Sequence, residues 1–393
     1  MMSAAMDCPV YDVDLYDDDV LRDPYPHYRA LRELGPVVWL PRNALYALGR
    51  FEDVRAALRN PDLFSSAQGV AANDRVNEMS RGTTLASDAP LHDRLRGIIA
   101  APLLPRALEQ IGPEIRAEAR RLVGDLVTRG QFDAVADLAQ HLPLTIVSKL
   151  VGLEDYGRGS MLRWASATFN VLGTMNERGC SAMADVLEMR GYLGGTAIRE
   201  RLLPGSWGQR IFEAADRGEV EPERCPVLMR DYIGPSLDTT IFATANLILL
   251  FGQYPEQWDL LRKEPTLIHN AINEALRLES PIRGFTRHLT NDATIGGVSV
   301  PRGSRVLLLY ASANRDERKW QDPECFDVRR RASDHLGFGN GTHMCAGLHL
   351  ARLEMTALLE VLLEKVTRFE IGEPVLALNN VLRGLASLPV RVS

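Results

Sequence analysis

The sequence has few cysteines, and they show no spacing typical of a metal site or a disulfide framework. The five are Cys8, Cys180, Cys225, Cys325 and Cys345, an odd number without a C-x-x-C pair. This scatter argues against a zinc site held by cysteines and against a disulfide-rich secreted fold. It is typical of a protein in a reducing compartment, so we expect a cytoplasmic location.

Long apolar runs are also missing. The most apolar run, Ile241 to Gly252, has 12 residues, which is short of the roughly 20 that span a bilayer. The first 20 residues or so are acidic and lack a signal-peptide pattern. We therefore expect no membrane anchor.

Basic stripes, internal repeats and Gly/Ser linkers are absent as well. A net charge of -6 over 393 residues argues against nucleic acid as the main partner. At 46% hydrophobic residues the chain can bury a large core. Without a linker, we expect a single domain over residues 1–393, with an acidic N-terminal segment over about residues 1–20.

Apolar spacing predicts a mainly α fold with a minor β component. Short strands are predicted at residues 37–40 and 44–49, and the stretch 298–316 is typical of two strands joined by a Pro-Arg-Gly turn. Helices are predicted at residues 27–34, 51–58, 113–129, 138–153, 226–252, 264–278 and 346–366.

The most informative stretch is HLGFGNGTHMCAGLHL, in which Cys345 follows a glycine-rich segment and precedes an apolar helix. Glycine permits close approach of a flat ligand. The positive end of a helix dipole favours a thiolate, so we expect a lowered pKa for Cys345. A thiolate there is suited to bind heme iron. Taken alone, a single cysteine is more often a buried apolar residue.

The spacing Phe338-x-x-Gly341-x-His343-x-Cys345-x-Gly347 resembles the heme-binding signature of the cytochrome P-450 superfamily. The stretch also resembles a dinucleotide-binding loop, but no clear strand precedes it. The cytochrome P-450 resemblance covers nearly the whole chain. It implies a fold in which heme b lies between a long distal helix and the cysteine loop, with Cys345 as the axial thiolate ligand.

Three charged residues match a structural cluster of that family. Glu274 and Arg277 match its Glu-x-x-Arg pair, and the i,i+3 spacing places both on one face of a helix. In the segment PECFDVRR, Arg330 matches the arginine that joins the pair, with Arg329 as the alternative register. The resemblance implies that this cluster supports the cysteine loop.

Heme carries two propionates, so a buried site needs cations to pair with them. His92 and Arg96 are spaced i,i+4 on a predicted helix and match propionate-binding positions of the family. Arg287 and His343 match two more. Any one of these alone is more often a solvated charge.

The distal helix of the family is matched by the stretch IGPSLDTT. Asp238 and Thr239 match the acid–alcohol pair that delivers protons while the O–O bond breaks. The alternative is an ordinary threonine whose hydroxyl bonds to a helix carbonyl. Pro235 and Ser236 stand where the family has smaller residues. We interpret Pro235 as a residue that enforces an opening of the helix and narrows the pocket.

Several stretches are similar to bacterial members that oxidise small para-substituted aromatics, including methoxybenzoates. The pocket candidates that follow from this resemblance are Gln68, Val70, Phe169, Leu172, Arg230, Asp231, Ile233, Pro235, Phe285, Thr286 and Leu382. Gln68 stands where benzoate oxidisers carry an arginine, and Asp231 adds an acid. The loss of one cation and the gain of one acid disfavour binding of a substrate that carries a carboxylate. We therefore expect a neutral methoxyphenol or another alkyl or alkoxy aromatic.

Such enzymes consume O2 and two electrons, and the chain shows no electron-transfer module. The resemblance implies a separate ferredoxin or flavodoxin with its reductase, for which Arg329 to Ala332 is a candidate docking segment. Four alternatives remain at this stage. They are hydroxylation of a terpenoid or other natural product, oxidation of a para-substituted benzoic acid, a heme-thiolate sensor without turnover, and a heme-free scaffold.

Overall fold

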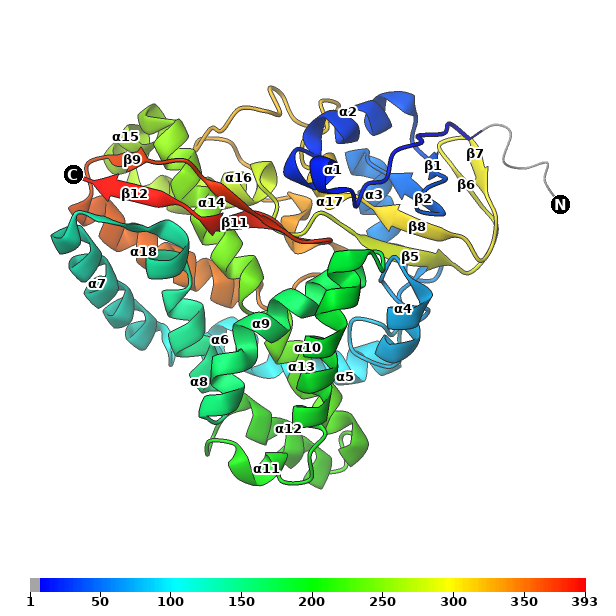
Figure 1. Ribbon diagram of the computed structural model, residues 1–393, viewed down its shortest axis with the longest axis horizontal. Coiled ribbons are helices and arrows are strands. Elements are labelled where there is room, and N and C mark those ends of the chain that lie inside the picture. The colour runs from blue at the N-terminus through cyan, green and yellow to red at the C-terminus, as the bar shows by residue number, and fades with distance from the viewer. Residues whose placement is uncertain (1–7) are drawn as a thin grey trace.

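The structure, a computed structural model, describes residues 8–393, so the first seven residues of the acidic N-terminal segment lie outside the described part. The fold is mainly α with a minor β component, as predicted. In Figure 1 the strands lie along the upper part of the molecule, and helices fill the lower part and the centre. The helices are α1 (Asp18–Arg22), α2 (Tyr25–Leu34), α3 (Phe51–Leu58), α4 (Asp74–Ser80), α5 (Leu91–Ala100), α6 (Pro105–Leu108), α7 (Gly112–Arg129), α8 (Ser148–Val151), α9 (Asp155–Leu172), α10 (Glu177–Leu193), α11 (Ile198–Arg201), α12 (Trp207–Asp216), α13 (Cys225–Ile233), α14 (Asp238–Gln253), α15 (Pro255–Lys263), α16 (Ile268–Leu278), α17 (Tyr310–Ala313) and α18 (Leu348–Lys365).

Twelve strands form four small sheets in the described part of the chain. The strands are β1 (Val38–Leu40), β2 (Leu45–Leu48), β3 (Phe64–Ser65), β4 (Gln131–Asp133), β5 (Phe285–Leu289), β6 (Ala293–Ile295), β7 (Val298–Val300), β8 (Arg305–Leu308), β9 (Phe369–Ile371), β10 (Val375–Leu378), β11 (Arg383–Ser387) and β12 (Pro389–Val392). The largest sheet has the order β1-β2-β8-β5-β3, and only β2 and β8 run parallel in it. The others are β4-β12-β9, β10-β11 and β6-β7.

The predicted pairing of two strands in residues 298–316 is wrong. Both strands exist on either side of the Pro-Arg-Gly turn, but they do not pair with each other. β7 alternates buried and exposed residues and pairs with β6 as a two-stranded ribbon. β8 is buried from its second residue onward, which fits a central strand between β2 and β5. The last predicted residues form α17 instead.

Predicted helices α2, α3, α7, α16 and α18 lie within a few residues of their expected bounds. The one predicted at 138–153 is divided into the π-helical turns η3 (Ala134–Ala139) and η4 (Pro143–Val147) followed by α8, because Pro143 lacks the N–H that a continuous helix needs. The long helices α9 and α10 were not predicted, since small residues interrupt their apolar stripes.

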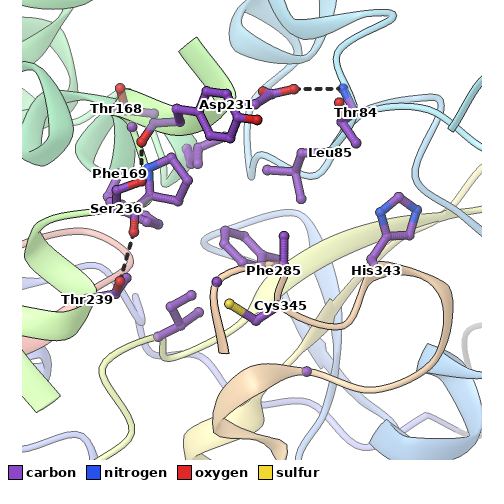
Figure 2. Close-up of a pocket in the computed structure, with 18 of the residues that line it drawn as sticks. Thr84, Leu85, Thr168, Phe169, Asp231, Ser236, Thr239, Phe285, His343 and Cys345 are labelled. Atoms are coloured by element: carbon purple, nitrogen blue, oxygen red, sulfur yellow. Dashed lines mark hydrogen bonds between the residues drawn. The ribbon is translucent and has the colours of Figure 1, made fainter. Parts of the chain in front are cut away.

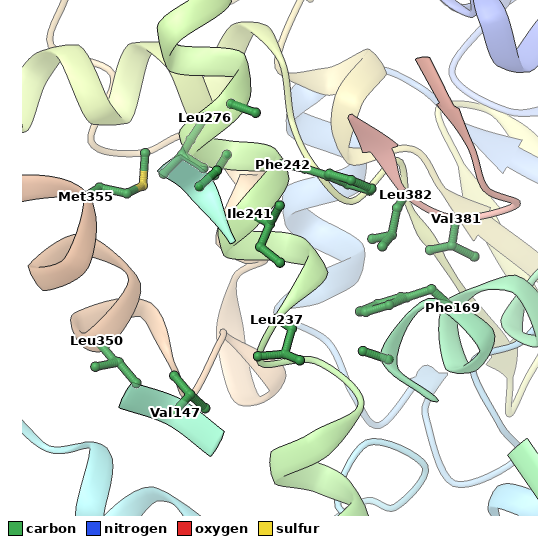
Figure 3. Close-up of a cluster of buried hydrophobic side chains, with 14 of the residues drawn as sticks. Val147, Phe169, Leu237, Ile241, Phe242, Leu276, Leu350, Met355, Val381 and Leu382 are labelled. Carbon is green, nitrogen blue, oxygen red and sulfur yellow. The ribbon is translucent and has the colours of Figure 1, made fainter. Parts of the chain in front are cut away.

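The predicted helix at 226–252 is also divided, into α13 and α14, with residues 234–237 outside both helices. By length and composition the stretch Pro222–Gln253 is apolar enough to cross a membrane, yet 78% of its most apolar window is buried inside the protein. Figure 3 shows why: Leu237, Ile241 and Phe242 contact a core built from several elements. That core also includes Val147, Phe169, Leu276, Leu350, Met355, Val381 and Leu382.

A buried ion cluster joins α16 to the segment before the cysteine loop. Glu274 and Arg277 have fully buried side chains and pair at 2.7 Å. Arg330 donates to the same carboxylate at 2.9 Å. Arg329 instead pairs with Glu264 at the surface, so Arg330 is the arginine that completes the cluster.

The cluster also holds backbone carbonyls. Arg277 donates to the carbonyls of Asn314, Pro323 and Cys325. Arg330 donates to those of Gln321 and Asp322. Because every bond from these two guanidinium groups to a backbone carbonyl ends on the segment 314–325, the position of the chain that leads to the cysteine loop depends on the buried carboxylate that neutralises them.

Glu274→Gln is therefore expected to destabilise the protein by roughly 3 kcal/mol or more, because two arginines lose their buried counter-charge. The matched control is Glu264→Gln, which removes the exposed Arg329 ion pair and is expected to cost less than about 1 kcal/mol. Urea unfolding of both variants measures the difference. Equal midpoints would contradict this account of the cluster.

Candidate active site

One large cavity lies between the helix break at 234–237 and the cysteine loop. It is bounded by the loop after α4, by α9, α10 and α13, by the start of β5 and by the first turns of α18. Figure 2 shows Phe169, Ser236 and Thr239 on one side of it and Cys345 and His343 on the other. Segments more than 200 residues apart in sequence therefore meet around one space.

The cysteine loop runs through two short turns, η7 (Leu336–Phe338) and η8 (Gly341–His343), before α18. The Cys345 N–H donates to the Phe338 carbonyl at 2.9 Å, which closes the loop. Gly341 has a φ of 69°, and a Cβ there would lie 2.4 Å from the Leu58 carbonyl oxygen. Gly341 is thus required by the backbone itself. At Gly347 a Cβ would meet only the Cys345 sulfur, at 3.9 Å.

The pKa of the Cys345 thiol is not lowered, contrary to the prediction from the sequence. Burial raises the pKa of this thiol above its ordinary value. The backbone N–H groups of Gly347 and Leu348 and the cations Arg96 and Arg352 act in the opposite direction. The helix start does favour the thiolate, as predicted, but desolvation outweighs it.

Two histidines and two arginines gather beside the cysteine loop. His92 and His343 lie with ring centroids 4.3 Å apart, and the Nε2 atom of each is buried without a hydrogen-bond partner in the described residues. Arg96 donates to the Met344 carbonyl and Arg287 to the Thr286 carbonyl. Neither arginine forms an ion pair within residues 8–393.

This cluster is electrostatically incomplete. Burial, together with the charges of Arg287, His92 and Arg96, lowers the pKa of His343 to about 3. Unpaired cations and orphaned ring nitrogens at a cavity wall are the features expected where carboxylates of a ligand bind. Together with a thiol facing the same cavity, they fit a heme with its two propionates.

The break between α13 and α14 is stabilised by side chains. The last helical bond of α13 runs from the Gly234 N–H to the Arg230 carbonyl, and Pro235 has no N–H to continue the series. The Ser236 hydroxyl donates to the Tyr232 carbonyl. The Thr239 hydroxyl donates to the Pro235 carbonyl at 2.8 Å. Two hydroxyls therefore replace backbone N–H groups across the opening, and Pro235 lines the cavity.

Asp238 and Thr239 open α14 and differ in their surroundings. Thr239 lines the cavity, and its hydroxyl donates to the Pro235 carbonyl, four residues earlier. This is the helix-carbonyl bond that the alternative interpretation of Thr239 expects. Asp238 is 3% exposed, and its Oδ2 atom has no partner among the described residues. Burial raises the pKa of Asp238 to about 7, while the nearby Ser166 side chain acts in the opposite direction. A carboxyl with this pKa exchanges a proton readily near neutral pH.

Most of the predicted substrate-pocket residues line the cavity. These are Val70, Phe169, Leu172, Arg230, Asp231, Pro235 and Phe285. Four others do not. Gln68 is exposed on a turn, Ile233 and Leu382 are packed in the core, and the Thr286 hydroxyl is turned away to the Ala71 carbonyl at 2.8 Å. The direction of these four side chains follows from the register of the helix, strand or loop that carries each, which a sequence match does not show.

The polar end of the cavity lies at Arg230 and Asp231. The Thr84 N–H donates to the Asp231 carboxylate at 3.3 Å, as the dashed line in Figure 2 shows. Burial raises the pKa of Asp231 and lowers the pKa of Arg230, because each charge is partly removed from water. An exposed arginine, Arg190, lines the same end and donates to the Met79 carbonyl at 3.0 Å.

Sequence reasoning missed one buried acid, Glu354 on α18. It lines the cavity, its Oε1 atom lacks a partner in the described part of the chain, and burial raises the pKa of this carboxyl to about 8. The signal was a lone carboxylate in an otherwise apolar helical stretch, LARLEM. Cys225, also buried, lies between α12 and α13 with its thiol towards the Ile211 carbonyl and does not line this cavity.

Asp238→Asn is expected to stabilise the protein at alkaline pH. The pKa of Asp238 is about 7 in the folded protein and 3.8 ordinarily, so the unfolded state loses its proton first as pH rises. The folded wild type therefore loses stability between about pH 4 and pH 7, by at most about 4 kcal/mol at 1.36 kcal/mol per pKa unit. Asparagine cannot titrate and escapes this loss. Unfolding of both proteins at pH 4.5 and pH 8 measures it, and an advantage that does not grow with pH would contradict the assignment.

Comparison with known proteins agrees with this geometry. The family profile for Cytochrome P450 matches residues 253–374. "Cytochrome p450 CYP199A2" of Rhodopseudomonas palustris is 37% identical over 390 residues, covering 98% of this chain and 95% of that protein. "Linalool 8-monooxygenase" of Pseudomonas putida is 31% identical, covering 96% and 98%. The solved structure "Epothilone B-bound Cytochrome P450epoK" has a TM-score of 0.86 at 26% identity, covering 97% and 100%.

The identity to these relatives extends over nearly the whole chain, and the thiol, the unpaired cations and the broken helix all face one cavity. The chain is therefore a bacterial cytochrome P450 monooxygenase, a member of a family whose cofactor is heme b bound through a cysteine thiolate.

Proposed function

We propose that this monooxygenase hydroxylates or O-demethylates a small neutral aromatic, such as a methoxyphenol or another alkyl or alkoxy aromatic. The observation that carries the proposal is an aromatic and aliphatic pocket, with Phe169 and Phe285, that has one polar end at Arg230 and Asp231. Heme bound by a thiolate supplies the O2 chemistry, in which one oxygen atom enters the substrate and the other leaves as water. The chain has to hold the heme, place the substrate and supply protons.

Cys345 is the proposed iron ligand. The proposed propionate partners are His92, Arg96, Arg287 and His343. Arg96, Arg287 and His343 line the cavity, and the buried His92 ring lies against the His343 ring. The remaining proposed contacts are Phe338, Gly341 and Gly347. The Arg352 guanidinium packs over the Phe338 ring, with its central carbon 5.2 Å from the ring centroid. Glu274, Arg277 and Arg330 act only by fixing the preceding segment.

Asp238 and Thr239 are the proposed proton-delivery residues. A carboxyl with a pKa of about 7 gives up and regains a proton near neutral pH. The Thr239 hydroxyl donates to the Pro235 carbonyl, so its oxygen lone pairs are left to accept a hydrogen bond on the cavity side.

The polar end favours a neutral hydroxyl over a carboxylate. A phenol hydroxyl both donates and accepts, so it can satisfy Asp231 and Arg230 together. A carboxylate gains from Arg230 but meets the charge of Asp231. Arg190 is exposed to solvent, so its charge is screened. Gln68, on the surface, adds no cation.

Electrons are proposed to come from a separate ferredoxin or flavodoxin with its reductase, in the cytoplasm. Two other substrate classes have a specific observation in their favour. Arg190 beside Arg230 favours a para-substituted benzoic acid. The 31% identical relative named as a linalool monooxygenase favours a terpenoid.

The substrate class is tested by titration of the heme spin state. We expect 4-methoxyphenol to bind more tightly than 4-methoxybenzoate, by roughly tenfold, since burying one uncompensated charge costs more than about 1.4 kcal/mol. Turnover with a surrogate ferredoxin and reductase should release formaldehyde from the methoxyphenol. A larger high-spin shift with 4-methoxybenzoate, or with linalool, would contradict the proposal.

Pro235→Ala should change substrate fit and coupling without loss of the heme. The substitution returns an N–H that can extend α13 by one bond, and it removes ring carbons from the cavity wall. Losing that apolar contact is expected to weaken binding of the aromatic by about 1 kcal/mol, or roughly fivefold. Product formed per NADH consumed measures the coupling. An unchanged spin-state titration together with unchanged coupling would show that Pro235 has no such role.

A further inference from the structure

The end of α4 and the segment after it form one wall of the active-site cavity. Six residues of this stretch line the cavity, and they are Met79, Ser80, Thr83, Thr84, Leu85 and Ala86. Two bonds from other elements hold its backbone. Arg224 donates to the Gly82 carbonyl at 2.9 Å, and the Asp231 carboxylate accepts from the Thr84 N–H at 3.3 Å. Both bonds use backbone atoms of the wall, so neither requires the Thr84 side chain.

Thr84 carries a buried hydroxyl without a partner. The residue is 4% exposed, and its Oγ1 atom forms no hydrogen bond among residues 8–393. The hydroxyls of two other threonines of the cavity wall are engaged within the protein. The Thr83 hydroxyl accepts from the Ala86 N–H at 3.0 Å, and the Thr168 hydroxyl donates to the Trp164 carbonyl at 2.8 Å. Because a buried hydroxyl without a partner is unfavourable, the Thr84 hydroxyl points to a polar group that enters the cavity.

This hydroxyl belongs to the polar end of the pocket. The Thr84 N–H bond to Asp231 joins the two residues directly, and Figure 2 shows them together at one end of the cavity. Arg230 precedes Asp231 on α13 and lines the same cavity. An acceptor, a donor and a hydroxyl that can act as either therefore gather at one end of an otherwise apolar pocket.

A phenol oxygen matches these three groups in number and kind. It has one proton to donate and two lone pairs that accept. The Asp231 carboxylate can take the proton, while Arg230 and the Thr84 hydroxyl can each donate to a lone pair. A methyl group in place of the phenol hydroxyl leaves all three groups without a partner, and a site built to bond a hydroxyl rejects an analogue that lacks it.

We propose that the Thr84 hydroxyl is a specificity-determining group that donates a hydrogen bond to the polar oxygen of the substrate, beside Asp231. This inference rests on the proposed function and adds to it a contact from outside α13. The competing arrangement is a hydroxyl turned to the Asp231 carboxylate, since the Thr84 side chain also lowers the pKa of Asp231. In that arrangement, removal of the hydroxyl makes Asp231 a stronger acceptor, so a phenol binds as tightly as before or more tightly. In the proposed arrangement a phenol binds less tightly.

The test compares two ligands on the heme-loaded protein and its variants. The ligands are 4-methoxyphenol and 4-methoxytoluene, in which a methyl group replaces the hydroxyl. Thr84→Val removes the hydroxyl at nearly constant volume, and Thr84→Ala is measured beside it in case the branched side chain disturbs folding. Thr84→Ser keeps a hydroxyl. Thr168→Val is the matched control, because it removes a hydroxyl of the same cavity wall whose proton is already donated within α9. Heme spin-state titration and isothermal calorimetry give the dissociation constants.

We expect Thr84→Val and Thr84→Ala to weaken binding of 4-methoxyphenol by roughly three- to tenfold, which is the effect of one lost hydrogen bond. Binding of 4-methoxytoluene should not weaken, because it has no oxygen at the polar end. Thr84→Ser should restore the preference for the phenol. Thr168→Val should leave the ratio of the two dissociation constants unchanged.

An unchanged ratio in Thr84→Val, tighter binding of the phenol, or an equal loss in Thr168→Val overturns the role of Thr84. If the wild type prefers 4-methoxyphenol in these cases, the proposed function stands. If the wild type instead binds 4-methoxybenzoate more tightly than 4-methoxyphenol, the proposed substrate class fails. Thr84 is then judged on the benzoate: a loss in Thr84→Val for 4-methoxybenzoate but not for 4-methoxytoluene supports its bond to the polar oxygen, and equal effects on both overturn it.

Discussion

The active-site architecture depends on one buried carboxylate. Glu274 neutralises Arg277 and Arg330, and those two arginines hold five backbone carbonyls of the segment 314–325. Without the carboxylate, two guanidinium groups would be buried without counter-charge. The chain that enters the cysteine loop is thereby fixed by contacts within the protein itself. The loop itself adds its own constraint at Gly341, where any side chain would collide with the Leu58 carbonyl.

The opposite side of the cavity is formed where the helix is interrupted between α13 and α14. Pro235 stops the backbone bonds of α13, and the hydroxyls of Ser236 and Thr239 satisfy carbonyls that the break exposes. The cost of a proline in a helix is therefore small here, because side chains replace the missing donors. The same residues form the cavity wall, so the device that opens the helix also shapes the pocket.

The sequence predicted which residues lie together where a motif combines particular residue types with a fixed spacing. The cysteine motif, the Glu274–Arg277 pair and the two arginines and two histidines beside the cysteine loop are close in type and spacing to known patterns, and the structure brings the members of each group together. It was less successful where only tertiary packing decides. The orientation of Thr286, the exposure of Gln68 and the pairing of β7 follow from sheet register. The acids Glu354 and Asp238 owe their raised pKa values to burial, which a single sequence does not show.

The break between α13 and α14 also places the polar residues of the substrate pocket on one helix and the proposed proton-delivery residues on another, and this separation has an evolutionary consequence. α13, with Arg230 and Asp231, packs on α5, α10 and α12, whereas α14, with Asp238, packs on α16, α18 and the strands β9 and β11. Apart from α9, which contacts both helices, substitutions that reshape the substrate end therefore act on a helix with neighbours different from those of the helix that carries Asp238. A lineage of this fold can change what it oxidises while the apparatus that moves protons stays intact.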